Sequence, residues 1–228
     1  MSRGTRITLL LAAADADGVA QSQTPAGAAD LTLNGALVTD GVGILATAGQ
    51  RVGRRVLVTT VSDESGKTLT IYGTGPLGNS ISESMTGPNA TTGYTVQDFV
   101  TVTRVAVSAA FTGAVTVGTN GIGGTAWVPL DVNRIGAWWS LGVILGVTAN
   151  VMPQGTLDPL YPDEQQWWMG QPTDSFWTPT PYDLQSSAMT ATNLVTGQVP
   201  LRGVRLLVNS GASTGAGINF EVVQQGLQ

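Results

Sequence analysis

The chain is dominated by short segments in which β-branched and apolar residues alternate with polar ones, the pattern of half-buried β-strands. These segments are RRVLVTTV (54–61), TLTIY (68–72), FVTVTRVAV (99–107), AVTV (114–117), VRLLV (204–208) and INFEVV (218–223). Clusters of Gly, Asn, Ser and Asp between them supply turn conformations, including those with positive φ. Convincing helical patterns are few, so the sequence predicts an all-β fold.

One arrangement recurs three times, in which a short Ser/Thr-Gly turn separates two strands. It occupies residues 56–73, 102–118 and 204–223. This spacing and turn chemistry predict three β-hairpins. The hairpins are irregularly separated, which disfavours a solenoid or a propeller. Repeated hairpins at short intervals instead favour a β-sandwich or jelly-roll-like packing.

The segment from Asn150 to Tyr182 has a different composition. It holds six of the eleven prolines and three of the six tryptophans. Prolines spaced in this way disfavour a continuous helix or a central strand. The pattern predicts a long, ordered Trp/Pro-rich arm, and loops of this length usually carry a function or a contact.

These patterns divide the chain near residue 131. Residues 1–131 are expected to form a β-sandwich or jelly-roll-like domain. Residues 132–228 are expected to form a second β unit that carries the arm (150–182) and the C-terminal hairpin. The alternative is that both halves share one core. The apolar run WWSLGVILGV (138–147) is too short to span a membrane and is interpreted as a buried strand pair.

The N-terminal stretch RITLLLAAADADGVA (6–20) allows two interpretations, a secretion signal or a first strand. A signal needs an unbroken apolar region behind a basic start. Here Thr8 interrupts the run, only two arginines precede it, and strand-like sequence follows. We therefore predict a first strand over Thr5–Leu11, no signal peptide, and a protein that stays in the cytoplasm unless a larger particle carries it out.

Composition narrows the function classes. Charged residues make up 11% of the chain, against roughly a quarter in typical soluble domains. A surface so poor in charge is typical of a protein that buries much of itself in an assembly. Cysteine and histidine are absent, which removes thiolate chemistry, the commonest zinc ligand and the commonest general base. The net charge is −5 and the ten basic residues form no cluster, so neither nucleic acid nor a membrane is an expected partner.

Several motifs resemble catalytic or binding sites, and each has a simpler structural explanation. The glycine-rich run 118–124 follows a strand but cannot open a helix, so a hairpin or domain-edge turn is expected in place of a phosphate loop. Asp63 and Glu64 lie in a turn sequence and are expected to be solvated turn-formers. Lys67, with Ser62 or Ser65, is the one candidate Ser–Lys pair, and a lysine beside a glycine turn is normally exposed.

Two further acidic motifs are weak. Asp163 and Glu164 are flanked by aromatic residues, which sugars favour, but no partner carboxylate for glycoside hydrolysis can be identified. Asp15-Ala16-Asp17-Gly18 lacks the remaining oxygen ligands of a calcium loop, and a turn explains it. We therefore expect no catalytic, cofactor or metal site.

The aromatic residues of the arm are the best interaction candidates, because large aromatics are enriched in interface hot spots. The predicted interface residues are Tyr161, Trp167, Trp168, Trp177 and Tyr182. Anchoring of the loop to its own chain, or sugar binding, are the alternatives. Trp138 and Trp139, next to an apolar run, are expected to be core residues.

Five segments resemble virion-associated proteins of tailed bacteriophages. They are DADGVAQSQTPAGAADLTLNGALV (15–38), RRVLVTTVSDESGKTLTIYGT (54–74), SESMTGPNA (82–90), TVGTNGIGGTAWVPLD (116–131) and VPLRGVRLLVNSGASTGAGINFEVVQQG (199–226). The resemblance covers well over half of the chain. It implies a structural component of the virion and brings no catalytic residues with it.

Together these observations predict a non-enzymatic virion protein. Small β-sandwiches resemble capsid decoration (cement) proteins, so the predicted role is that of a capsid decoration or cement protein. Its partners would be major capsid protein subunits and further copies of itself, as a dimer or a trimer. A neck, tail or fibre-base component is the alternative within the virion. A carbohydrate-binding module on the virion surface is a further alternative, and a polysaccharide-degrading enzyme a fourth.

Overall fold

The computed structural model describes residues 3–9, 11, 13–47, 49, 51–131, 138–158, 160, 179–210 and 217–225. Over these residues the chain forms strands and no helix, which confirms the predicted all-β class. The strands build three sheets, and every strand ladder in them is antiparallel.

The smallest sheet has four strands in the order β1-β18-β13-β16. They are β1 (Arg3–Leu9), β18 (Ile218–Gln225), β13 (Trp138–Leu145) and β16 (Asn193–Gly197). The six-stranded sheet has the order β4-β5-β10-β7-β8, with β3 beside β10. Its strands are β3 (Ala29–Asp30), β4 (Val38–Thr39), β5 (Val42–Ile44), β7 (Thr68–Thr74), β8 (Ser80–Thr86) and β10 (Thr101–Val107).

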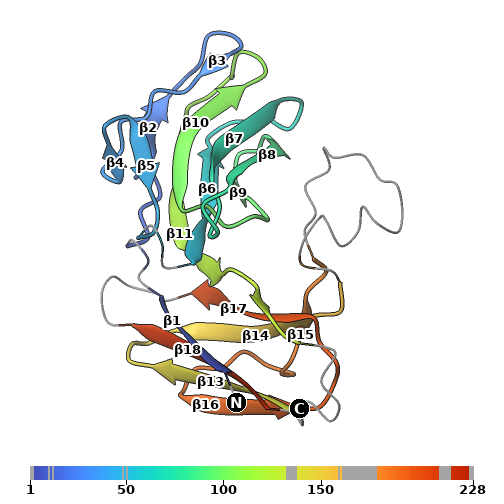
Figure 1. Cartoon of the computed structure of the whole chain (residues 1–228). Coiled ribbons are helices and arrows are strands. Elements are labelled where there is room, and N and C mark those ends of the chain that lie inside the picture. The colour runs from blue at the N-terminus through green and yellow to red at the C-terminus, as the bar shows by residue number, and fades with distance from the viewer. Residues whose placement is uncertain are drawn as a thin grey trace.

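The eight-stranded sheet has the order β15-β14-β17-β11-β6-β9, with β12 beside β17 and β2 beside β11. Its strands are β2 (Ala20–Gln23), β6 (Val52–Thr60), β9 (Thr92–Tyr94), β11 (Val115–Thr125), β12 (Val128–Pro129), β14 (Asn150–Thr156), β15 (Tyr182–Asp183) and β17 (Gly203–Ser210). This sheet runs through both halves of the molecule, which lie one above the other in Figure 1. The upper half contains the six-stranded sheet with β6 and β11, and the lower half contains the four-stranded sheet with β14 and β17.

Two hydrophobic clusters form the core. The upper cluster lies between the six-stranded sheet and the β6/β11 part of the eight-stranded sheet, and it contains Phe99, Ile71 and Val58. The lower cluster lies between the four-stranded sheet and the β14/β17 part, and it contains Phe220 and Leu206. It also includes residues from both sides of position 131, and the division of the chain at that point stays a prediction.

The three predicted hairpins are wrong in their pairing, although their strands are present. β6 pairs with β11 and β9, whereas β7 pairs with β10 and β8, so residues 56–73 cross from one sheet to another. The segments 102–118 and 204–223 cross in the same way, from β10 to β11 and from β17 to β18. The two strands that flank each turn belong to opposite sheets, and each buries one face in the core between those sheets. The turn therefore carries the chain from one sheet to the other. A tight hairpin turn does occur between β4 and β5, where Asp40 and Gly41 have φ of 52° and 77°.

The first strand is confirmed with a shift in its bounds. β1 spans Arg3–Leu9, pairs with β18 along its whole length, and buries Ile7 and Leu9 in the lower cluster. Leu11, the predicted last residue, forms an isolated bridge with Ala46. The N-terminal apolar run is therefore part of the folded core.

Two other segments differ from expectation. Residues 138–147 contain one strand, β13, and not a strand pair, and of its two tryptophans only Trp139 is buried. The glycine-rich run 118–124 lies inside β11 and is not a turn, although the register with β6 shifts between Thr119 and Gly123. Gly118 is required because a Cβ there would lie 2.1 Å from the carbonyl oxygen of Asp15.

The predicted arm is described only at its two ends. Its first seven residues form β14, which lies between β15 and β17, so the prediction that the prolines disfavour a central strand is wrong for this part of the arm. Pro153 has no backbone N–H to donate. It is tolerated in β14 because the neighbouring strand β15 pairs only with Gln154 and Gly155. Residues 161–178 lie outside the described residues.

Candidate functional site

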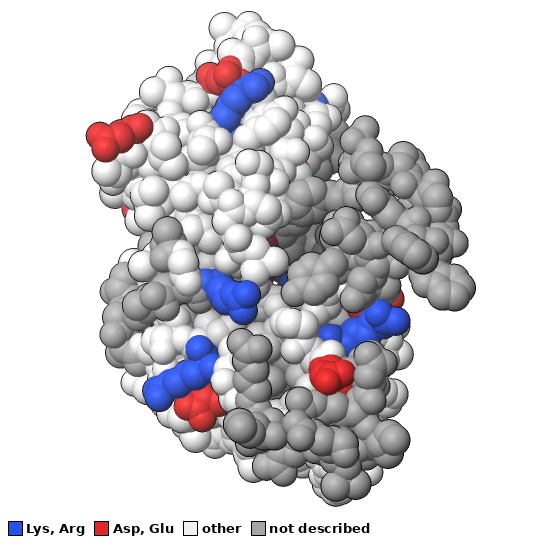
Figure 2. All heavy atoms as spheres, in the orientation of Figure 1, with Lys and Arg blue, Asp and Glu red and all other residues white. Residues whose placement is uncertain are grey.

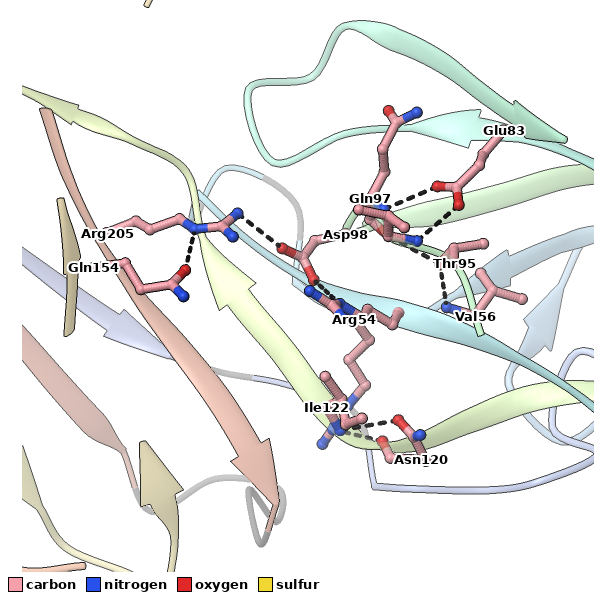
Figure 3. A network of polar contacts seen from close by, with 12 residues as sticks. Arg54, Val56, Glu83, Thr95, Gln97, Asp98, Asn120, Ile122, Gln154 and Arg205 are labelled. Carbon is pink, nitrogen blue, oxygen red and sulfur yellow. Dashed lines mark hydrogen bonds and ion pairs between the residues drawn. The ribbon is translucent and has the colours of Figure 1, made fainter. Parts of the chain in front are cut away.

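A cluster of buried and partly buried polar side chains lies where β6, β11 and β17 adjoin, at the junction of the upper and lower halves (Figure 3). We call it the waist cluster, and it consists of Arg54, Arg55, Asp98, Gln154 and Arg205. β6 supplies two of its arginines, β17 the third and β14 the glutamine, while Asp98 lies between β9 and β10. Side chains from both halves therefore meet in one place.

Asp98 is the only acidic member of the cluster. Its side chain is 5% exposed, and two guanidinium groups flank its carboxylate. Nε of Arg55 lies 4.0 Å from Oδ1, and Nη1 of Arg205 lies 3.9 Å from Oδ2. These distances are too long for hydrogen bonds, and Oδ1 of Asp98 and Nε of Arg55 are buried without a hydrogen-bond partner in the described structure. The negative charge of Asp98 is therefore balanced by guanidinium groups that lie beyond hydrogen-bonding distance, and the carboxylate has little contact with solvent.

The pKa values of the cluster reflect this burial. Burial raises the pKa of Asp98 to about 6, and the opposing attraction of Arg205 and Arg55 does not restore it, while Glu83 raises it further. Burial lowers the pKa of Arg54 to about 10 and also lowers that of Arg205. Arg54 therefore stays protonated at neutral pH, whereas the pKa of Asp98 lies close to neutral pH.

Hydrogen bonds link the cluster to both halves. Nη1 of Arg54 donates to the carbonyl oxygen of Asn120, 3.0 Å away in β11. Nε of Arg205 donates to Oε1 of Gln154 at 2.9 Å, and the Gln154 amide donates to Asp183 at 2.8 Å. The guanidinium of Arg205 also lies over the ring of Trp127, 4.9 Å from its centre.

The geometry suits a structural joint better than a reaction centre. A general base must reach a substrate proton. Asp98 is instead enclosed between guanidinium groups that come from its own half and from the other half. The waist cluster is therefore best understood as a structural junction, where side chains of the β6/β11 part of the sheet meet those of β14 and β17.

A second buried acid joins two loops of the upper half. The prediction that Glu64 is a solvated turn-former is wrong, because its side chain is fully buried. It accepts hydrogen bonds from the backbone N–H groups of Thr112 and Gly113, at 2.8 and 2.9 Å, and from Nζ of Lys67. Burial opposes the ionisation of Glu64, but these donors outweigh it and hold the pKa below its usual value.

Lys67 is correspondingly not the exposed residue that was expected. Its side chain is 20% exposed, and Nζ also donates to Oγ1 of Thr112 and lies 5.3 Å from the centre of the Phe111 ring. Neither Ser62 nor Ser65 is among its hydrogen-bond partners in the described structure. The Ser–Lys pair is therefore not assembled, and Lys67 and Glu64 together fasten the 62–67 turn to residues 111–113.

The remaining sequence candidates fall into two groups. The DADG motif is a turn, as predicted, in which Oδ1 of Asp15 accepts the N–H of Asp17. No group of three or more acidic side chains in the described residues could hold a metal ion. Tyr182 is 49% exposed at the start of β15. The other predicted interface residues and the acidic pair of the arm lie outside the described residues, namely Tyr161, Asp163, Glu164, Trp167, Trp168 and Trp177.

One surface was missed by the sequence analysis. Trp138 and Ile144 of β13, together with Leu194 of β16, are 54%, 40% and 61% exposed. Leu194 lies opposite Gly142, so the three side chains share the outer face of the four-stranded sheet. We call this surface the uncharged corner, because residues 135–157 and 184–201 contain no charged residue. The signal in the sequence is that Trp138 alternates with the buried residues of β13, so its side chain lies on the face of the strand that turns away from the core.

Comparison with known proteins adds no relative. No family model matches the chain, and no curated protein matches it. Among the described residues, no helix has the length and apolar character that crossing a membrane would require.

Proposed function

We propose that this protein is a structural component of a tailed-bacteriophage virion, most specifically a capsid decoration or cement protein. In this proposal it is not an enzyme. It is made in the host cytoplasm and becomes part of the particle, where it braces the shell by bridging coat subunits.

One observation carries the proposal, namely a surface that is poor in charge and carries exposed large apolar side chains in both halves. On the face seen in Figure 2, the charged side chains are few and scattered among uncharged ones. Val61 and Val96 are 68% and 64% exposed in the upper half, and Leu194 is 61% exposed in the lower half. Such surfaces favour protein contacts over free solution. The resemblance of five sequence segments to phage virion proteins supplies the kind of assembly.

The proposed mechanism is binding energy alone. A standard protein interface of roughly 1,600 Å² is sufficient for stable attachment. The anchors would be Tyr161, Trp167, Trp168, Trp177 and Tyr182, since buried aromatic side chains dominate interface energetics. The prolines between them would lower the entropy lost when the arm becomes ordered against a coat subunit.

The finer interpretation of the fold belongs to this proposal. Each hydrophobic cluster lies between two sheets, and three turns carry the chain from one sheet to another. We interpret this as sandwich or jelly-roll-like packing, which is common in capsid proteins.

Co-sedimentation with empty coat shells tests the proposal. We expect the purified protein to sediment with shells, and a variant with Trp167→Ala and Trp168→Ala to bind at least tenfold more weakly. Val61→Ala, which truncates one exposed apolar side chain outside the arm, is the comparison variant and should weaken binding less than about twofold, because it removes far less contact area than the two tryptophans. Protein that stays in the supernatant with shells, but whose tryptophan fluorescence shifts with host polysaccharide, would contradict the proposal and favour the carbohydrate-binding module.

A further inference from the structure

The sheet that connects the two halves of the molecule is narrow where it passes from one half to the other. Each half has its own hydrophobic cluster, and the eight-stranded sheet continues between them through β11 and β17. In the described structure these two strands pair at two positions of β11, Gly123 and Gly124. A Cβ at Gly124 would lie 3.0 Å from Oδ2 of Asp98 and 3.1 Å from the carbonyl oxygen of Leu206 in β17. Asp98 therefore packs against the backbone of this joint.

The joint accommodates the ionised form of Asp98 poorly. The side chain is 5% exposed, and its Oδ1 has no hydrogen-bond partner in the described structure. The guanidinium groups of Arg55 and Arg205 balance its charge from 4.0 and 3.9 Å, without hydrogen bonds. A buried charge that lacks hydrogen bonds is costly, whereas a neutral carboxyl group costs much less. Protonation of Asp98 therefore favours the closed joint, and ionisation favours an arrangement in which water reaches the carboxylate.

The charged groups around Asp98 come from both halves (Figure 3). Arg55 of β6 and Arg205 of β17 lower its pKa, Glu83 of β8 raises it, and burial outweighs all three and brings it to about 6. Arg54, the other arginine of β6, donates to the carbonyl oxygen of Asn120. Beyond Arg205 lie two residues of the lower half, Gln154 of β14 and Asp183 of β15.

The composition of the chain makes a titration near pH 6 easy to assign. The chain contains no histidine, which is the side chain whose ordinary pKa lies between about 5 and 8. Among the described acidic residues, Asp98 is the one whose pKa is raised into this range. A structural change that depends on pH near 6 would therefore point to Asp98.

We infer that the waist cluster is a pH-dependent joint, in which ionisation of Asp98 loosens its packing against β11 and β17 and lets the two halves change their relative orientation. This inference does not rest on the proposed function. In the open joint water reaches the carboxylate, and its pKa returns to the ordinary value of 3.8. The difference of about two units raises the ratio of open to closed molecules about a hundredfold as the pH rises from about 4 to about 6. An ordinary salt bridge would behave in the opposite way and open in acid.

A distance measured between the two halves tests the joint in the full-length protein. The chain has no cysteine, so Val61→Cys in the upper half and Leu194→Cys in the lower half give two unique sites for spin labels. Both side chains are exposed, at 68% and 61%. Pulsed electron paramagnetic resonance should give one narrow distance distribution at about pH 4 and a second population at about pH 8. Asp98→Asn cannot ionise and should keep the low-pH distribution throughout.

Two further variants make the result specific. Asp30→Asn removes an exposed acid of the upper half that pairs with Arg104, and this matched control should keep the pH dependence of the wild type. Arg205→Gln removes an attraction that lowers the pKa of Asp98, so the upper end of the transition should move to higher pH. A purely structural role of Arg205 would not move it. Circular dichroism of each variant checks that the fold is retained.

The outcomes are separate from those of the proposed function. A wild-type distribution that is the same at both pH values overturns the joint, as does a change that persists in Asp98→Asn. A transition that Arg205→Gln leaves at the same pH also contradicts it, because the charge of Asp98 would then not be sensed across the junction. Binding to coat shells is measured independently and depends on none of these results.

Discussion

Replacing Asp98 by Asn removes the only titratable acid of the waist cluster and should remove a defined part of the pH dependence of stability. The pKa of Asp98 is raised by burial from 3.8 to about 6. Between these values the folded protein holds a proton on Asp98 that the unfolded chain has released. The contribution of this group to the free energy of unfolding is therefore fully present below about pH 4 and is lost as the pH rises through about 6.

The size follows from the shift. Two pKa units correspond to about 3 kcal/mol, at about 1.4 kcal/mol for each unit. The neutral Asn side chain has nearly the same shape and does not titrate, so all other groups cancel in the comparison. Relative to Asp98→Asn, the wild type should lose about 3 kcal/mol of stability between pH 4 and pH 7.

Urea unfolding of both proteins across this pH range measures the difference directly. The expected curve falls with pH and has its midpoint between the two pKa values. A difference that does not change with pH would refute the reasoning, as would one that rises, because a rise means that Arg55 and Arg205 lower the pKa of Asp98 more than burial raises it.

Three further predictions concern the core and the loops, each measured as the change in unfolding free energy in urea. Glu64→Gln should cost about 2 kcal/mol, since it leaves Lys67 without its counter-charge, and an unchanged midpoint would show that the ion pair contributes nothing. Trp139→Ala should cost about 3–5 kcal/mol because its ring is buried, whereas Trp138→Ala should change stability by less than about 0.5 kcal/mol, and equal effects would contradict the assigned faces of β13. Gly118→Ala should cost at least about 1 kcal/mol because its Cβ would overlap Asp15, and a neutral result would exclude this close approach.

Local patterns predicted the strands of this protein but not their partners. The alternation in RRVLVTTV and VRLLV correctly predicted β6 and β17. The Ser/Thr-Gly turns between strands predict hairpins, because turn chemistry is a property of four or five residues. Whether the chain then returns to the same sheet or crosses to the opposite one depends on which face of the next strand is buried, and that is decided by contacts far along the sequence.

The site residues show the same limit. Glu64 and Asp98 have turn-like or loop-like neighbours, and nothing local indicates that each is buried. Glu64 is buried because residues 112–113 supply two N–H donors, and Asp98 because β17 brings Arg205 beside it. A charged residue inside an apolar run, as Arg205 is in VRLLV, is the one sequence signal that could have suggested this junction.

The central claim is that this chain acts as a building block of the phage head, and the number of copies in purified particles tests it most directly. Quantitative mass spectrometry against the major capsid protein gives that number. A decoration protein should be present in hundreds of copies, in a fixed ratio to the coat subunit. A count of about six to twelve, as a single ring of cyclic symmetry would give, would contradict the assignment to the head and move the protein to the neck or tail.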